Sequence, residues 1–103
     1  MTINIQYVKI KASESLSKYV TRKLQKLDKN YDWLIRADVF FKVENDSSEK
    51  GNICEIELSL PGPKIFAMSN EKNFEVAVKE TISDLSVQLK KRKAQFTKQR
   101  ISS

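Results

Sequence analysis

Histidine is absent from this chain of 103 residues, so the usual proton shuttle at neutral pH and the commonest metal ligand are both missing. The only glycines are Gly51 and Gly62, too few for a Walker loop or a dinucleotide-binding fingerprint. Cys54 is the sole cysteine, whereas a zinc site needs three or four ligands of the Cys or His type. No nucleophile–base pair can be assembled either. We therefore expect no enzyme activity, no catalytic residue, no metal site, no cofactor and no small-molecule substrate.

Long apolar runs are also missing, since none approaches the roughly 18 residues that suggest a membrane span. The N-terminal segment lacks the basic-then-apolar layout of a secretory signal. One cysteine excludes an intramolecular disulfide and fits a reducing compartment. We expect a cytoplasmic protein without membrane contact. The length predicts a single domain, 1–103, with a short basic C-terminal end from about residue 97.

Charge, in contrast, is plentiful and unevenly placed. Residues 1–30 contain seven Lys/Arg and two Asp/Glu, and residues 79–103 contain the same numbers. The middle, 31–78, contains five basic and nine acidic residues, so the three segments carry about +5, −4 and +5, in agreement with the net charge of +6. Two basic ends around an acidic centre indicate an oriented electrostatic surface and predict a polyanionic partner.

Apolar spacing predicts six elements in the order β-α-β-β-β-α, because alternation is typical of strands and three- to four-residue spacing of helices. Ser13 or Ser15 is expected to cap the first helix, and Asn73 the second. The expected segments are strands at 2–7, 35–44, 54–60 and 64–69, helices from 13–15 to about 30 and from 73 to 98, and turns at 45–51 and 61–63.

This order predicts a two-layer α+β domain, with a mainly antiparallel four-stranded sheet and two helices on one face. The connection after the first strand is long enough to permit a parallel pairing. Two sets of residues are expected to face the helices: Ile35, Ala37, Val39, Phe41 and Val43, and Cys54, Ile56, Leu58 and Leu60.

The first helix carries a basic stripe nearly opposite its apolar one. Its members are Lys18, Arg22, Lys26 and Lys29, with Lys23 to one side. A solvated helix face is the plain alternative, but such faces usually mix charges of both signs. Like charges four residues apart are destabilising, and only Glu14 and Asp28 are acidic across this helix. The stripe therefore favours polyanion binding.

The last helix ends in a denser cluster, Lys90-Lys91-Arg92-Lys93, with Lys98 and Arg100 beyond. Arg92 continues the buried stripe, so we expect the helix to have left the body of the protein by that residue. A helix from 73 to 98 spans about 40 Å, which is longer than a small core. A projecting basic helix end suits phosphate contact, and a basic tail that merely aids solubility is the alternative.

The sheet face away from the helices is expected to expose apolar side chains. They are Phe40, Ile53, Phe66 and Met68, with Glu55 and Glu57 beside them. Exposed aromatics can stack on bases, but neighbouring carboxylates repel phosphate. Contact with a protein partner, through Phe40 and Phe66, or partial self-shielding of the patch is therefore the favoured interpretation. Trp33 is expected to be a packing anchor at the corner between helix and strand.

Several segments together resemble the ribosome hibernation-promoting factor family, which includes the ribosome-associated inhibitor proteins. The resemblance covers residues 2 to about 98. It rests on Glu14-x-Leu16, Tyr19-Val20, Lys23-x-x-Lys26-Leu27, the strand Val39-Phe40-Phe41-Lys42-Val43-Glu44, Asn73-Phe74-x-x-Ala77-Val78 and Leu85-x-x-Gln88-Leu89-x-Lys91-x-Lys93.

The resemblance implies a fold similar to double-stranded-RNA-binding domains. It also implies repression of translation during stress or stationary phase, through binding in the tRNA/mRNA decoding channel of the small ribosomal subunit. A second, ribosome-dimerising factor is a further implied partner. No second dimerising domain is seen in the sequence, which favours the short form. Family basic positions match Lys23, Lys26, Lys91 and Lys93, whereas Asp84 and Val87 stand where basic residues are common.

The expected RNA-binding set joins these positions to their basic neighbours. It comprises Arg22, Lys23, Lys26, Lys29, Lys90, Lys91, Arg92 and Lys93. Two other functions stay open at this point. One is a free double-stranded-RNA-binding protein. The other is a protein-interaction module, or a regulator of a transcription factor, that uses the outer sheet face.

Overall fold

A computed structural model describes the backbone of residues 1–45 and 49–102 and the side chains of 1–45 and 49–97. The predicted element order is confirmed, and part of the expected turn at 45–51 lies outside the described residues. The elements are β1 (Thr2–Tyr7), α1 (Glu14–Asn30), β2 (Arg36–Val43), β3 (Asn52–Ser59), β4 (Ile65–Glu71) and α2 (Phe74–Ser102).

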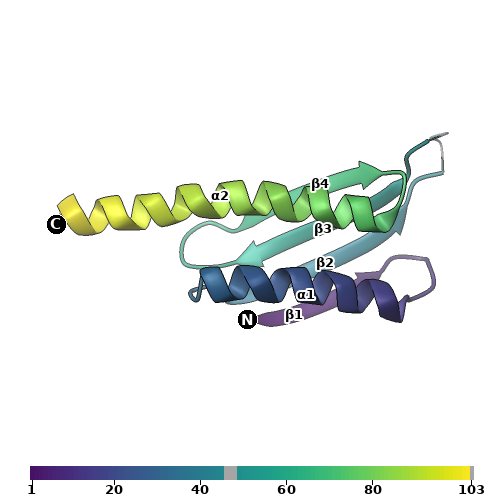
Figure 1. Cartoon of the computed structure of the whole chain (residues 1–103), viewed down its shortest axis with the longest axis horizontal. Helices are drawn as coiled ribbons and strands as arrows, with labels where there is room; N and C mark the ends of the chain where they lie inside the picture. The colour runs from purple at the N-terminus through teal and green to yellow at the C-terminus, as the bar shows by residue number, and fades with distance from the viewer. Residues whose placement is uncertain (46–48, 103) are drawn as a thin grey trace.

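The four strands form one sheet in the order β1-β2-β3-β4. β1 runs parallel to β2, with Ile5 beside Val39, because α1 carries the chain back to the starting end of the sheet. β2 with β3 and β3 with β4 are antiparallel pairs. Figure 1 shows both helices side by side over one face, which confirms the predicted two-layer fold.

The core lies between the helices and the covered sheet face. It is built from the predicted stripes, including Leu16, Val20, Leu24 and Leu27 of α1, Ala37, Val39, Phe41, Cys54, Ile56 and Leu58 of the sheet, and Val78, Leu85 and Leu89 of α2. The end members of the first predicted set, Ile35 and Val43, are not part of the core, since they are 59% and 44% exposed. Both stand at the ends of the β2 run, past the part of the sheet that the core covers.

Both predicted helix caps are present. The Leu16 amide donates to Oγ of Ser13 at 3.3 Å, and the Val76 amide donates to Oδ1 of Asn73 at 2.9 Å. Each bond satisfies one amide that the helix itself leaves without a partner. Both helices start at the same end of the molecule and run side by side, so α1 ends beside α2, and the longer α2 extends beyond that point (Figure 1).

The later part of α2 stays in contact with the body, contrary to the expectation that it leaves at Arg92. Gln88 Nε2 donates to the Phe66 carbonyl at 3.0 Å. The Arg92 guanidinium donates to the carbonyls of Pro61 and Pro63, each at 2.9 Å. Arg92 continues the buried stripe without entering the core, because the 61–63 turn presents carbonyl oxygens to it. The helix also continues to Ser102.

Candidate nucleic-acid interface

The basic stripe of α1 is exposed. Arg22, Lys26 and Lys29 are all exposed, and none forms an ion pair with another described residue. Lys18 differs, because its Nζ lies 3.2 Å from the Glu14 carboxylate one turn earlier. The part of the stripe nearer the end of α1 is therefore the part with unneutralised charge.

Lys23 lies beside the stripe rather than within it. Its Nζ is 5.6 Å from the centroid of the Tyr19 ring, a distance at which the ring face attracts a cation. Lys23 is half-buried, and Tyr19 Oη is buried without a hydrogen-bond partner among the described residues. Lys23 is thus less available to a ligand than Arg22 or Lys26.

The cluster on α2 separates into two kinds of residue. Lys90, Lys91 and Lys93 are exposed and form no ion pair with any described residue. Arg92 is half-buried, and its two terminal nitrogens are engaged by the 61–63 turn. The side chains of Lys98 and Arg100, also part of the predicted cluster, lie outside the described residues.

The two basic segments meet where α1 ends. Tyr31 closes α1 through a 2.9 Å bond from its amide to the Leu27 carbonyl, and Lys93 Nζ lies 5.9 Å from the Tyr31 ring centroid. Trp33 contacts Tyr31 and Phe96 edge-to-face, with ring centroids 5.6 and 5.1 Å apart. We give the name basic end surface to the exposed, unpaired cations of these two segments: Arg22, Lys26 and Lys29 of α1, and Lys90, Lys91 and Lys93 of α2. Within this set Lys93 lies beside the end of α1, and Lys91 lies near Ile65 of β4.

The outer sheet face is electrically different, because its charges are paired. Lys42 lies 2.8 Å from Glu55, and Lys64 lies 2.9 Å from Glu57. Phe66 and Met68 are each 52% exposed between these ion pairs, while Phe40 and Ile53 are half-buried. This face thus combines local neutrality with exposed apolar area, unlike the helical side.

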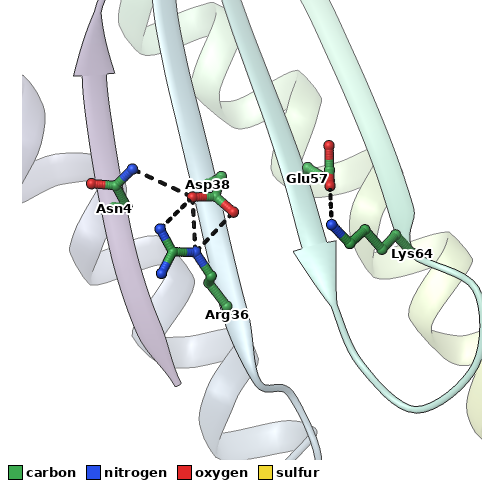
Figure 2. A network of polar contacts seen from close by, with 5 residues as sticks. All are labelled: Asn4, Arg36, Asp38, Glu57 and Lys64. Carbon is green, nitrogen blue, oxygen red and sulfur yellow. Dashed lines mark hydrogen bonds and ion pairs between the residues drawn. The ribbon is translucent and has the colours of Figure 1, made fainter.

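Figure 2 shows a second group of charges on the same sheet face. Nε of Arg36 donates to both carboxylate oxygens of Asp38 at 3.0 Å, and Asn4 Nδ2 donates to Oδ1 at 3.4 Å. The hydrogen bond from Arg36 lowers the pKa of Asp38 below its usual value. The hydrogen bond that Lys64 donates to Glu57 favours the charged ammonium group and so raises the pKa of Lys64.

The described residues contain no group of three His, Cys, Asp or Glu side chains that could hold a metal ion. Burial raises the pKa of the Cys54 thiol to about 12, so it stays protonated and unreactive. Among helices in the described part of the chain, none is both long and apolar enough to cross a bilayer.

One feature of the site was missed at the level of sequence. Phe96 had no assigned role and Trp33 was assigned to packing alone, yet together they form the aromatic corner between the two basic segments. The signal was present, because Phe96 follows Leu85 and Leu89 along one side of the helix.

The sequence matches a family model described as "Sigma 54 modulation protein / S30EA ribosomal protein" over residues 3–97. The ribosome hibernation promotion factor of Deinococcus radiodurans is 30% identical over 92 residues, which are 88% of this chain and 48% of that protein. The ribosome hibernation promoting factor of Pseudomonas putida is 27% identical over 93 residues, covering 90% of this chain and 87% of that protein. The chain therefore spans about half the length of the Deinococcus relative.

Two solved structures share the fold. A ribosomal subunit interface protein from Coxiella burnetii superposes with a TM-score of 0.81 at 23% identity, covering 91% of this chain and 99% of that one. The N-terminal domain of Protein Y from Thermus thermophilus gives a TM-score of 0.74 at 22% identity, covering 88% and 98%. With nearly the whole sequence matched by the family model, the chain belongs to the Sigma 54 modulation protein / S30EA ribosomal protein family, that of the ribosome hibernation-promoting factors.

Proposed function

We propose that this chain is a ribosome hibernation factor that binds the small ribosomal subunit in the tRNA/mRNA decoding channel and represses translation during stress or stationary phase. It acts in the cytoplasm, and residues 1–103 form a single ribosome-binding domain. The chain belongs to a family of hibernation factors rather than of enzymes, which confirms the expectation that it is not an enzyme.

The observation that carries the proposal is the separation of unpaired from paired charge. The basic end surface gathers exposed cations of two helices, none of them in an ion pair with a described residue. The outer sheet face pairs its cations with carboxylates. Phosphate contacts supply affinity without reading sequence, so such a surface suits a folded RNA of fixed shape. Within the proposed contact set, Lys23 and Arg92 flank this surface.

Co-sedimentation with small ribosomal subunits tests the surface. A variant with Lys26, Lys29, Lys90 and Lys91 changed to Glu should lose binding. A matched control changes Lys9, Lys11, Lys72 and Lys79 to Glu at the other end of the helices. Each variant takes the net charge from +6 to −2, since every reversal subtracts two charges. Because only the location differs, the control should retain most of its binding, and equal loss in both variants would reduce the proposal to bulk charge.

Competition tests the position of binding. If the protein occupies the decoding channel, then tRNA and mRNA bound to the small subunit should displace it, and excess protein should displace them in turn. Simultaneous binding of protein, tRNA and mRNA would contradict the proposed place. Affinity should also fall with salt, with a log–log slope of about −0.9 for each phosphate neutralised on a duplex and about −0.7 on a single strand.

A plain RNA duplex separates this function from that of a free double-stranded-RNA-binding protein. We expect small subunits to be bound much more tightly than a duplex at the same salt concentration. Sucrose gradients from stationary-phase cells, with and without the gene, test the cellular role. A change in dimeric ribosomes would show whether a second, ribosome-dimerising factor acts with this chain.

For the outer sheet face, we propose a protein contact through Phe40 and Phe66. Support comes from the exposed half of Phe66 between neutral ion pairs, an apolar area that carries little net charge. Changing both residues to Ser should abolish cross-linking to the partner, with the ribosome-dimerising factor as the first partner tested. Binding to small subunits should be unchanged, and its loss would show that the face contributes to folding or RNA contact instead.

A further inference from the structure

We propose that the groove between the segment just after α1 and residues 93–97 of α2 binds one unpaired nucleobase of an RNA strand. The groove has a volume of about 250 Å³ and is lined by Asp32, Trp33, Lys93, Phe96 and Thr97. The inference rests on the proposed function in taking RNA as the ligand, and it adds a base-recognition site to a surface that otherwise contacts phosphates.

Size and aromatic walls favour a single flat ring. The groove lies just below the range of roughly 300–1,000 Å³ that is usual for drug-sized ligands and cofactors. Trp33 and Phe96 form its apolar part, and both are half-buried rather than covered. Single-stranded RNA is commonly bound by stacking its bases on such partly exposed aromatic side chains.

The aromatic pair reaches beyond the core through Phe96. Phe96 lies two helical turns beyond Leu89, which is the last residue of α2 in the core. Trp33 packs against the edge of the core, and its contact with Phe96 extends that packing outward, beside the exposed Lys93 of the basic end surface. Lys93 belongs both to that surface and to the lining of the groove, so the two are continuous.

The polar rim supplies a basis for choosing between bases. Lys93 can donate to a phosphate, whereas the exposed carboxylate of Asp32 can only accept hydrogen bonds. Asp32 makes no ion pair with the described residues, so it is available to an amino group. Adenine, cytosine and guanine carry an exocyclic amino group and uracil does not. We expect the groove to prefer bases with that group.

Trp33 provides a direct readout because it is the sole tryptophan of the chain. We would titrate the full chain with oligocytidine and oligouridine of six nucleotides and with a blunt RNA duplex, following Trp33 fluorescence. We expect saturable quenching of the fluorescence by both single strands, with a lower Kd for oligocytidine than for oligouridine. The duplex should quench weakly or not at all. Equal responses to all three RNAs, or none, would overturn the proposal.

Three variants assign the response to the groove. Phe96→Leu should weaken oligocytidine binding about tenfold, since base stacking on an aromatic residue is worth about 1–3 kcal/mol. Phe66→Leu, on the outer sheet face, is the matched control and should change nothing. Asp32→Ala should bring the oligocytidine-to-oligouridine affinity ratio close to one without weakening oligouridine binding. An unchanged ratio would remove Asp32 from the site, and with it the proposed base preference.

These measurements are separate from the test of the proposed function. Quenching that depends on Phe96, in a protein that fails to bind small subunits, would contradict only the ribosomal function. Binding to small subunits with no quenching by single strands, and with full affinity retained in Phe96→Leu, would contradict only the base site. Circular dichroism of each variant confirms that the fold is intact before affinities are compared.

Discussion

Arg92 offers the sharpest test of how the structure divides roles within the basic cluster of α2. Its guanidinium donates to the carbonyls of Pro61 and Pro63, whereas its neighbour Lys91 is exposed and forms no ion pair with a described residue. Replacement of Arg92 by Ala should therefore lower stability, and replacement of Lys91 by Ala should lower RNA affinity. Sequence alone places the two residues in one cluster and predicts no difference.

The size of the stability loss in Arg92→Ala follows from the two hydrogen bonds that the substitution removes. A bond from a charged donor contributes about 1.5–3 kcal/mol, but these carbonyls belong to an exposed turn and water can replace the lost donor. We expect Arg92→Ala to lower the free energy of unfolding by about 1–2 kcal/mol. For a domain of this size each ~1 kcal/mol shifts the Tm by about 4–8 °C. The free energy of unfolding of Lys91→Ala should stay within about 0.5 kcal/mol of that of the starting protein.

Urea unfolding followed by Trp33 fluorescence and by circular dichroism measures both variants. Arg92→Lys is an informative third, because an ammonium group lacks the planar fork that reaches two carbonyls at once. It should recover less than half of the lost stability. Gly62 restricts substitution in the turn itself, since a Cβ at this position would lie 3.0 Å from the Arg92 guanidinium.

The outcome that refutes this reasoning is specific. If Arg92→Ala unfolds at the same urea concentration as the starting protein and loses ribosome affinity as Lys91→Ala does, then Arg92 is an RNA contact and its bonds to the 61–63 turn contribute nothing measurable. A loss of stability with ribosome affinity retained supports the structural role.

Three further predictions concern the sheet and its core. Because the pKa of Cys54 is raised to about 12, a thiol reagent at pH 8 should react slowly with the folded protein and rapidly in denaturant; fast reaction in both would show that the thiol is accessible. The lowered pKa of Asp38 contributes stability at neutral pH that is lost as the pH falls through that pKa, so Asp38→Asn should flatten the acid side of a plot of urea midpoint against pH. If the urea midpoint of Asp38→Asn falls at low pH as it does in the starting protein, the ion pair between Asp38 and Arg36 does not contribute to stability. Thr81 is buried and its hydroxyl donates to the Ala77 carbonyl at 2.8 Å, so Thr81→Val should cost about 1 kcal/mol by calorimetry, and a more stable variant would contradict this.

The element order and both caps could be predicted because they depend on neighbours in the sequence. Ser13 and Asn73 act on amides three residues away, and alternation in β2 and β3 records which side of the sheet is covered. Alternation does not record where coverage stops. Ile35 and Val43 continue the alternation of the buried residues and yet lie exposed, because the extent of the core depends on how far the helices reach over the sheet.

The candidate site divides in the same way. Helical spacing alone brings Arg22, Lys26 and Lys29 to one face, and the sequence predicts that stripe directly. The engagement of Arg92 by a turn some 30 residues earlier depends on tertiary structure that no local pattern contains. The meeting of Trp33 with Phe96 is of the same kind, since it depends on how α2 lies beside the end of α1.

The bond from Gln88 to the carbonyl of Phe66 has a consequence for how this protein behaves at high concentration. β4 is an outermost strand of the sheet, and it carries two apolar side chains, Phe66 and Met68, that are half exposed. Such a strand invites edge-to-edge pairing with another chain, which leads to aggregation. Gln88 occupies one backbone acceptor of this edge, and Arg92 occupies the carbonyls just before it. α2 thus shields β4 against self-association. Substitutions that remove these hydrogen bonds would favour aggregation of folded molecules under conditions in which the protein is not yet unfolded.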